Sequence, residues 1–271
     1  METKQLNTLD YTSYTDNQEE LVNVVLTELE TTGYIVIKNF DVDTNDVEAS
    51  GKAMLHISSL VGTPISHDAV NSIIWDIKSN PASTSNIKTY SEHSHEAELH
   101  TDSQYSFYPE DYFGLLTLKP AECGGGESFL LSLKDILTEL RALPNGAELE
   151  KTLRETDYPF IVPNVFKKSD TEDNEFNFGP ILRENEIRFR VDTFEKALRL
   201  RPDFCTDIQV EAYNALKDII LNSPSTQNFF LEEKDLIFIN NKSMLHGRGE
   251  FTDHNRHLLR IRMNKEGANL N

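Results

Sequence analysis

The chain has 271 residues and carries 26 lysines and arginines against 45 aspartates and glutamates, a formal net charge of −19. We expect one domain over residues 1–271, with the polar residues 1–17 loosely ordered. The negative charge disfavours nucleic acid and anionic membranes as partners. Two cysteines cannot form a disulfide framework, and neither a basic leader nor a long apolar stretch is visible, so we expect a cytoplasmic protein of unknown oligomeric state.

In chain order, the first third of the sequence alternates helical and strand-like patterns. Apolar residues spaced three and four apart predict a helix over 17–32, ended by Gly33. GYIVIKNF then predicts a buried strand, a second helix is expected near 45–61, and a further strand is expected at NSIIWDI, with Trp75 in the core. The polar segment 78–98 is expected to be a long loop, a kind of segment that is often functional.

The rest of the chain favours short strands. We expect strands in YFGLLTL and ESFLLS, with Cys123 buried between them, and helices in SLKDILTELRAL and DIQVEAYNALKDIILN. EFNFGPILRE and EIRFRVD are expected to pair around a tight turn at Asn185, and further strands follow towards residue 263. This order predicts a β-sandwich or barrel decorated by helices.

The stretch AELHTDSQYS places His100 and Asp102 two residues apart. If residues 99–104 are extended, alternate side chains share a face, so Glu98, His100, Asp102 and Gln104 point the same way. His246, in MLHGRGEF after a strand-like run, is the candidate third ligand. Two histidines and one carboxylate leave coordination positions open, as in non-heme Fe(II) oxygenases. Zinc accepts the same donors, so ligand type alone does not select the metal.

Three arginines share one predicted strand face near the end of the chain. In RHLLRIRM, an extended backbone puts Arg256, Arg260 and Arg262 on the face opposite Leu259 and Ile261. Inward arginines need anionic partners. Arg256 and Arg260 lie roughly 13 Å apart along a strand, too far to hold one small carboxylate together, so two separate anions are expected. Arg262 is expected to form an ordinary salt bridge at the strand end.

Four segments in this order, LHTD, GGGES, MLHGR and RHLLR, resemble the motifs of the Fe(II)- and 2-oxoglutarate-dependent dioxygenases of the taurine dioxygenase and clavaminate synthase group. The resemblance runs from about Gly33 to Met263. It implies a mainly β fold with flanking helices (α+β), built on a double-stranded β-helix, or jelly-roll, core. It also implies that Fe(II) is the metal and that 2-oxoglutarate and O2 are the cosubstrates.

The resemblance assigns roles to five residues. His100, Asp102 and His246 match the iron ligands. Arg256 matches the arginine that holds the distal carboxylate of 2-oxoglutarate. Ser128 stands where a hydroxyl residue, more often threonine, assists that arginine, and a serine hydroxyl can donate the same hydrogen bond.

Three more residues are candidates for substrate binding. Arg260 matches a second arginine that often faces substrate or cosubstrate in the group, and Asp192 resembles an acidic position that recognises substrate in some of its amino-acid hydroxylases. Glu98 shares the expected iron face and suits an ammonium group. An outward turn for Glu98 and a surface salt bridge for Asp192 are equally open. Together these residues suit a zwitterion, so we expect hydroxylation of an unactivated C–H bond in a free amino acid or derivative. Halogenation is disfavoured, because halogenating members of the group lack the carboxylate that Asp102 supplies.

Several alternatives accompany this interpretation. The substrate could be a small sulfonate or other organic acid held by Arg260 alone. A non-catalytic β-helix that binds a ligand would keep the fold but has little reason to keep three metal ligands, and a zinc hydrolase lacks a glutamate in an HExxH context. His93 and His95 suit either a second metal site or, more simply, a solvated loop near the pocket entrance. Substrate specificity is expected to reside in residues 78–98 and 166–173.

Overall fold

The computed structural model describes residues 5–66, 72–79, 93–162 and 175–267. Its helices are α1 (Gln18–Thr31), α2 (Val47–Val61), α3 (Leu133–Ala142), α4 (Gly146–Glu155), α5 (Val191–Leu200) and α6 (Asp207–Asn222). The four predicted helices, α1, α2, α3 and α6, are confirmed. Each begins after a side chain that accepts a hydrogen bond from the backbone of the first turn: Asn17, Asp46, Ser132 and Thr206.

The described strands form three sheets. In order across the large sheet lie β1 (Thr8–Asp10), β2 (Tyr34–Lys38), β11 (Leu236–Asn240), β6 (Tyr112–Lys119), β13 (His257–Asn264) and β3 (Thr63–Ile65), with β4 (Ile74–Lys78) also pairing with β13. The small sheet has the order β10 (Gln227–Phe229), β7 (Ser128–Ser132), β12 (Met244–Arg248) and β5 (Ala97–His100). β8 (Tyr158–Ile161) and β9 (Phe176–Gly179) pair separately.

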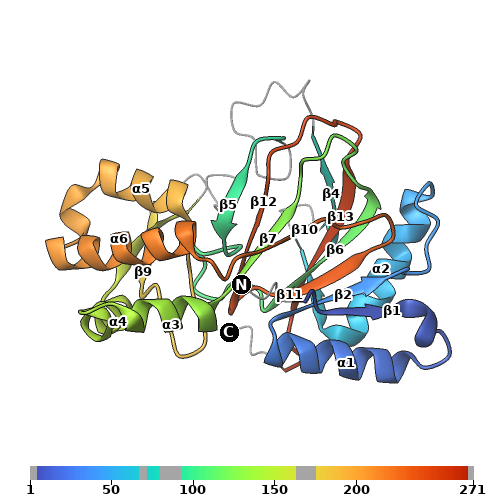
Figure 1. Ribbon diagram of the computed structural model, residues 1–271, viewed down its shortest axis with the longest axis horizontal. Coiled ribbons are helices and arrows are strands. Elements are labelled where there is room, and N and C mark those ends of the chain that lie inside the picture. The colour runs from blue at the N-terminus through green and yellow to red at the C-terminus, as the bar shows by residue number, and fades with distance from the viewer. Residues whose placement is uncertain (1–4, 67–71, 80–92, 163–174, 268–271) are drawn as a thin grey trace.

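The elements are layered around the two main sheets (Figure 1). Helices α1 and α2 lie on one side of the molecule next to the large sheet, and α3 to α6 gather at the opposite end, beyond the small sheet. One apolar cluster fills the space between the two sheets, a second lies under α1 and α2, and a third joins α3 to α6 with β8. The predicted mainly β, α+β fold with a jelly-roll core is therefore confirmed.

Strand β13 shows how the sequence pattern positions the site. Leu258 packs in the cluster between the sheets, whereas Leu259 and Ile261 pack under α1 and α2. The alternation predicted from RHLLRIRM is thus present in the structure, and it turns Arg260 and Arg262 towards the small sheet, where both reach Asp102. The large sheet therefore contributes cations to a site whose histidines lie on the small sheet.

The segment around Asn185 differs from its prediction. The two halves meet only at an isolated bridge between Leu182 and Ile187, and β9 pairs with β8 instead. The end of the second half begins helix α5, where Phe194 and Ala197 face the apolar cluster of the helical end. The backbone of Phe189 pairs with Thr101 instead of extending the predicted pair of strands, and only Val191 of RFRV belongs to the helix. Helix α4 was not predicted either.

Three smaller predictions are also corrected. Residues 8–10, expected to be loose, form β1, because their backbone pairs in parallel with β2. Cys123 is exposed rather than buried, since it lies in the turn before the glycines of GGGES. Trp75 is only partly buried, because β4 pairs with β13 alone. The predicted specificity segment 166–173 and most of segment 78–98 lie outside the described residues.

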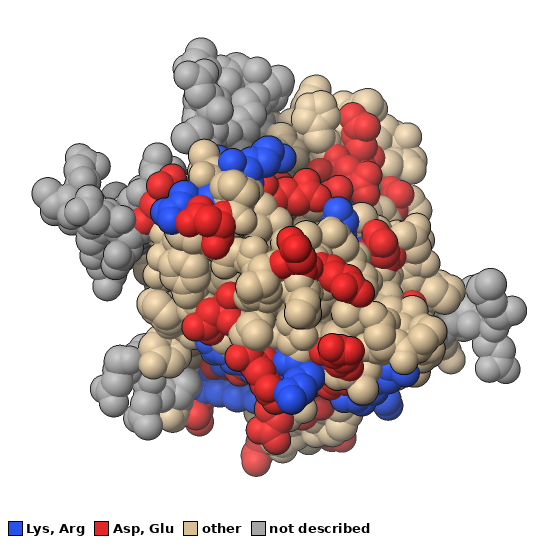
Figure 2. Space-filling model, turned by 90° about the vertical axis from the view of Figure 1, so that its left-hand side faces the viewer, with Lys and Arg blue, Asp and Glu red and all other residues tan. Residues whose placement is uncertain are grey.

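The surface over the helical end is acidic in character. Figure 2, which views the side on which α3 to α6 lie, shows red acidic side chains spread across that face, with fewer blue basic ones between them. Among the described residues, no helix combines the length and the apolar character that crossing a bilayer requires.

Candidate metal centre

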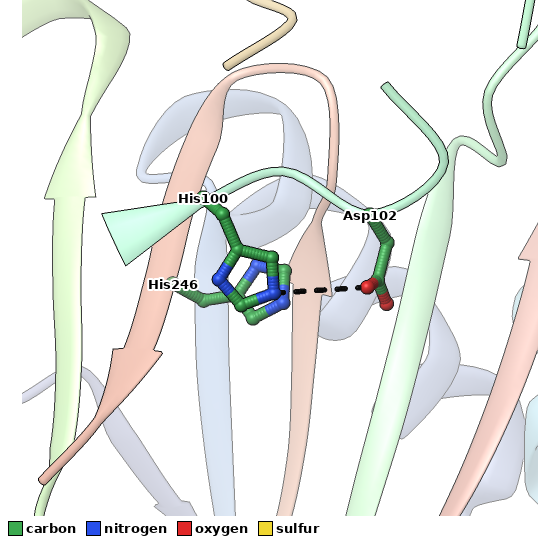
Figure 3. Close-up of side chains that lie close together, drawn as sticks. All are labelled: His100, Asp102 and His246. Carbon is green, nitrogen blue, oxygen red and sulfur yellow. Dashed lines mark ion pairs between the residues drawn. The ribbon is translucent and has the colours of Figure 1, made fainter. Parts of the chain in front are cut away.

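Two histidines meet on neighbouring strands of the small sheet. His100 ends β5, His246 lies in the middle of β12, and the two residues are direct partners in the antiparallel register. Directly opposite residues project to the same face of a sheet, and the ring centroids are 4.3 Å apart. Figure 3 shows the His100 ring in front of the His246 ring, with a nitrogen of each ring on the side of the Asp102 carboxylate.

Asp102 reaches this face through a turn rather than through strand alternation. Strand β5 ends at His100, and Ser103 has a positive φ of 50°, so the extended backbone expected over 99–104 is wrong beyond His100. The turn nevertheless brings Asp102 Oδ1 to 3.8 Å from His100 Nε2. One candidate ligand atom from each of His100, Asp102 and His246 lies within 4.8 Å of the others.

The buried side chain of Asn241 holds that turn. Its Oδ1 accepts a hydrogen bond from the backbone N–H of Asp102 at 2.8 Å, and its Nδ2 donates to the carbonyl of Asp102 at 3.2 Å and to that of Glu110 at 3.1 Å. Asn241 lies between β11 and β12, five residues before His246. Sequence reasoning missed this residue; its signal was the polar pair Asn-Asn directly after the apolar run DLIFI.

The protonation states suit metal binding. The Nδ1–H of His100 donates to the carbonyl of Glu98 at 2.7 Å, so the ring lone pair is on Nε2, and burial lowers the pKa of His100 to about 4. Burial, followed by the neighbouring His100, holds the pKa of His246 well below its usual value. Two neutral imidazoles and one carboxylate fit a divalent cation with open positions.

Asp102 is ionised despite its burial. Burial opposes ionisation, but Arg260 and Arg262 outweigh it and hold the pKa of the Asp102 carboxyl well below its usual range. Both arginines contact Asp102 Oδ2: Arg260 Nη1 lies 3.2 Å and Arg262 Nη2 3.6 Å from it. The other carboxylate oxygen, Oδ1, faces His100. The salt bridge expected for Arg262 is present, with Glu110, but it is buried, and Arg262 also contacts a candidate metal ligand.

Arg256 lies in a separate recess. It is 7 % exposed, and it lines a pocket of about 370 Å³ together with Gly126 and Leu258. Glu122 and Glu232 also line this pocket, yet among the described residues no carboxylate forms an ion pair with Arg256. Burial, followed by the nearby Arg248, lowers the pKa of Arg256 to about 9. A buried guanidinium without a counter-ion indicates an anion-binding position.

The glycines of GGGES allow close approach to this arginine. Gly126 has a φ of 82°, and a Cβ atom there would lie 3.5 Å from Arg256 Nε. At Gly125 a Cβ would come within 2.3 Å of the carbonyl oxygen of Glu250, so a larger residue does not fit. Ser128, two residues after Gly126, begins β7 and lies opposite Arg248 of β12. The motif thus places a hydroxyl residue close in sequence to the arginine pocket.

The two predicted acidic residues lie in different surroundings. Glu98 is partly buried, and burial followed by repulsion from Glu96 and Asp192 raises its pKa. Asp192 is the second residue of α5 and accepts two hydrogen bonds from Arg190, at 2.7 and 2.9 Å. Its charge influences Glu98, so the two carboxylates share one region. Glu98 remains a candidate for a cation, whereas Asp192 already has a cationic partner.

His93 and His95 belong to a loop that packs against the turn after β12. Arg248 donates hydrogen bonds to the carbonyls of both residues, and the backbone N–H of Phe251 donates to Ser94 at 3.0 Å. The ring of His95 lies 3.4 Å from the carboxylate of the exposed Glu250. Among the described residues the only grouping with metal-ligand geometry is His100, Asp102 and His246, which disfavours a second metal site at this loop.

Taken together, two facing sheets that enclose a two-histidine, one-carboxylate centre define the class of non-heme metal-dependent oxygenases. The chain belongs to the family described as "Taurine catabolism dioxygenase TauD, TfdA family", which matches residues 2–262. This result confirms the resemblance inferred from LHTD, GGGES, MLHGR and RHLLR.

Solved structures with the same fold extend over most of the chain. An asparagine oxygenase in complex with Fe(II), 2S,3S-3-hydroxyasparagine and succinate has a TM-score of 0.71 at 17% identity, covering 91% of this chain and 79% of the other. The non-heme iron oxygenase OrfP with Fe, succinate and (3S)-hydroxy-L-Arg has a TM-score of 0.71 at 18% identity, covering 92% and 80%. OrfP with Fe and alpha-ketoglutaric acid has a TM-score of 0.66 at 18% identity, covering 92% and 79%. No curated protein sequence matches this chain.

Proposed function

We propose that this protein is an Fe(II)- and 2-oxoglutarate-dependent dioxygenase that hydroxylates an unactivated C–H bond of a free amino acid or a close derivative. The observation that carries the proposal is the convergence of His100, Asp102 and His246 on one point, with ligand atoms within 4.8 Å of one another, in a chain of the TauD family. The buried Arg256, which forms no ion pair with the described residues, adds a position for an anionic cosubstrate.

His100, Asp102 and His246 would hold the iron. The hydrogen bond from His100 Nδ1 to the carbonyl of Glu98 fixes the tautomer in which Nε2 is the ligand. When bound, iron with 2-oxoglutarate and O2 supplies the oxidising chemistry that replaces C–H by C–OH. The protein's own contribution is to orient the ligands and the substrate. Because Asp102 occupies a ligand position, hydroxylation is favoured over halogenation.

Arg256 and Ser128 would bind the distal carboxylate of 2-oxoglutarate. A guanidinium fork pairs with a carboxylate in a bidentate manner, and burial strengthens that attraction because water does not compete. The carboxylate would also restore charge balance in the pocket lined by Gly126 and Leu258. Arg256 directly precedes β13 and Arg260 is its fourth residue, so the extended backbone between them keeps this anion separate from any anion beside Asp102.

Arg260 would bind the carboxylate of the substrate and Glu98 its ammonium group. Burial lowers the pKa of Arg260, and its Nε is buried without a hydrogen-bond partner among the described residues, so a substrate carboxylate would complete its contacts. Glu98 offers the complementary charge for an ammonium group, and Asp192, held by Arg190, adds negative charge nearby. The solved relatives with hydroxyasparagine and hydroxyarginine support an amino acid as substrate.

A substrate panel tests the proposal. Purified protein with Fe(II), ascorbate and 2-oxoglutarate is incubated with each free amino acid, with N-acetyl and amide forms, and with small sulfonates. Succinate release coupled to the gain of one oxygen atom by the compound identifies the substrate. We expect at least one free amino acid to be hydroxylated, and we expect its N-acetyl form to be a poor substrate because acylation removes the ammonium charge.

Two controls separate the parts of the proposal. The His246→Ala variant should release no succinate with any compound, because one of the metal ligands is missing. Turnover of sulfonates or amine-free acids, with none of any free amino acid, would reject the amino-acid assignment and favour an anion held by Arg260 alone. Full activity of His246→Ala would reject the metal site itself.

A further inference from the structure

Two buried arginines contact the same oxygen of Asp102, but only one of them has a carboxylate partner of its own. Arg262 Nε lies 2.8 Å from Glu110 Oε1, and the side chains of Arg262 and Glu110 are 10% and 2% exposed. Arg260 has no second carboxylate within ion-pair distance among the described residues. The two arginines therefore have different electrostatic surroundings although they lie two residues apart on β13.

The ion-pair geometry separates the two arginines. Arg262 lies within ion-pair distance of two carboxylates, those of Asp102 and Glu110. Arg260 pairs with Asp102 alone among the described residues.

Glu110 is itself fixed relative to Asp102. Asn241 Nδ2 donates to the carbonyl oxygens of both acids, so one amide links their backbones, while Arg262 links their side chains. Asp102 Oδ2 faces the arginines and Oδ1 faces His100 at 3.8 Å. This arrangement holds the carboxylate in one orientation, with Oδ1 directed at the candidate metal position.

We propose that the ion pair of Arg262 with Glu110 positions the carboxylate of Asp102 for metal binding. Arg262 is then a positioning residue that acts through Asp102, and Arg260 stays available for an anionic group of the substrate. The inference rests on the proposed metal site but not on the identity of the substrate. Groups that orient a metal ligand typically change metal affinity about 10- to 100-fold when they are removed.

The test measures Co(II) affinity of the metal-free protein, by titration calorimetry and by the visible absorption of Co(II). Removing Arg262 alone mixes two effects of opposite sign, because the lost cation favours a divalent ion while the lost orientation disfavours it. The double variant Arg262→Met/Glu110→Gln removes both charges together and leaves no unpaired buried charge. We expect it to bind Co(II) about 10-fold or more weakly than the parent.

The matched control is Arg260→Met, on the same face of β13. It removes a cation that lies closer to Asp102, at 3.2 Å. If Arg260 affects the metal only through its charge, removing that charge leaves Co(II) binding unchanged or makes it tighter, because the guanidinium repels a divalent cation. Circular dichroism verifies that each variant is folded. A third variant, Glu110→Gln, retains Arg262 but frees it from its partner, and it should also weaken Co(II) binding.

The outcomes distinguish this inference from the proposed function. Weakened binding in the double variant together with undiminished binding in Arg260→Met supports the positioning role. A parent that binds Co(II), with a double variant of equal affinity, overturns only this inference, and so does an Arg260→Met variant that loses as much affinity as the double variant. A parent without Co(II) binding overturns the metal site and this inference together.

Discussion

At the scale of single residues, Arg256 is buried and forms no ion pair with the described residues, which points to an anionic ligand. If its guanidinium holds the distal carboxylate of 2-oxoglutarate, Arg256→Ala removes a charge-assisted contact worth about 1.5–3 kcal/mol. The KM for 2-oxoglutarate should then rise about 10- to 100-fold. Succinate formation as a function of 2-oxoglutarate concentration measures this, with Arg199→Ala, an exposed arginine of α5, as the control. An unchanged KM would remove Arg256 from the cosubstrate site.

The two cysteines should differ in reactivity because their surroundings shift the pKa in opposite directions. Backbone N–H groups of Thr252, Gly125 and Asp253 lower the pKa of the exposed Cys123 to about 7, whereas burial raises the pKa of Cys205 to about 11. Since the thiolate is the nucleophile, iodoacetamide should alkylate Cys123 with a half-maximal rate near pH 7 and should spare Cys205 there. Peptide mass mapping over a pH series checks this. A midpoint at about 8.5, as for a free thiol, would contradict it.

At the scale of secondary-structure elements, the connection between β11 and β12 determines where the turn after β5 lies. Asn241→Ala leaves the backbone N–H of Asp102 and two carbonyls without their partner, and each buried group so left costs about 1–3 kcal/mol. The free energy of unfolding in urea should fall accordingly, whereas Asn228→Ala, exposed on β10, should leave it unchanged. Equal stability of the two variants would show that Asn241 does not hold the turn.

The elements also show what the sequence could predict. The strand β13 follows from alternation because Leu259, Ile261 and Met263 make one of its faces apolar. The ligands His100, Asp102 and His246 were found by residue type and order, and the structure brings them together. Asn241 could not be found this way, since its function depends on a contact with a residue 139 positions away. The salt bridge expected for Arg262 is present, but its burial and its second carboxylate, that of Asp102, could not be predicted from position in a strand.

At the scale of the whole molecule, the candidate residues for metal and cosubstrate come from both main sheets. The histidines lie on the small sheet, whereas Arg256 precedes β13 of the large one. We therefore expect Mn(II) and 2-oxoglutarate together to raise the thermal midpoint. Saturation to about 100 times Kd adds about 2.7 kcal/mol, or roughly 5–10 °C for a domain of this size. In Arg256→Ala the rise in thermal midpoint caused by 2-oxoglutarate should disappear, while the rise caused by Mn(II) remains. An equal response of parent and variant in differential scanning fluorimetry would contradict this.

Strand β5 is the edge of the small sheet, and beyond it the backbone of Thr101 continues the pairing with a segment of the helical end. The N–H of Thr101 donates to the carbonyl of Phe189 at 2.9 Å, and the N–H of Phe189 donates to Thr101 Oγ1 at 3.1 Å. The segment that carries Asp192 is therefore attached next to a metal ligand by two contacts. If Asp192 contributes to substrate binding, we expect substitutions in the residues after Phe189 to change which substrate is accepted without moving the metal ligands, as long as the two contacts with Thr101 are kept.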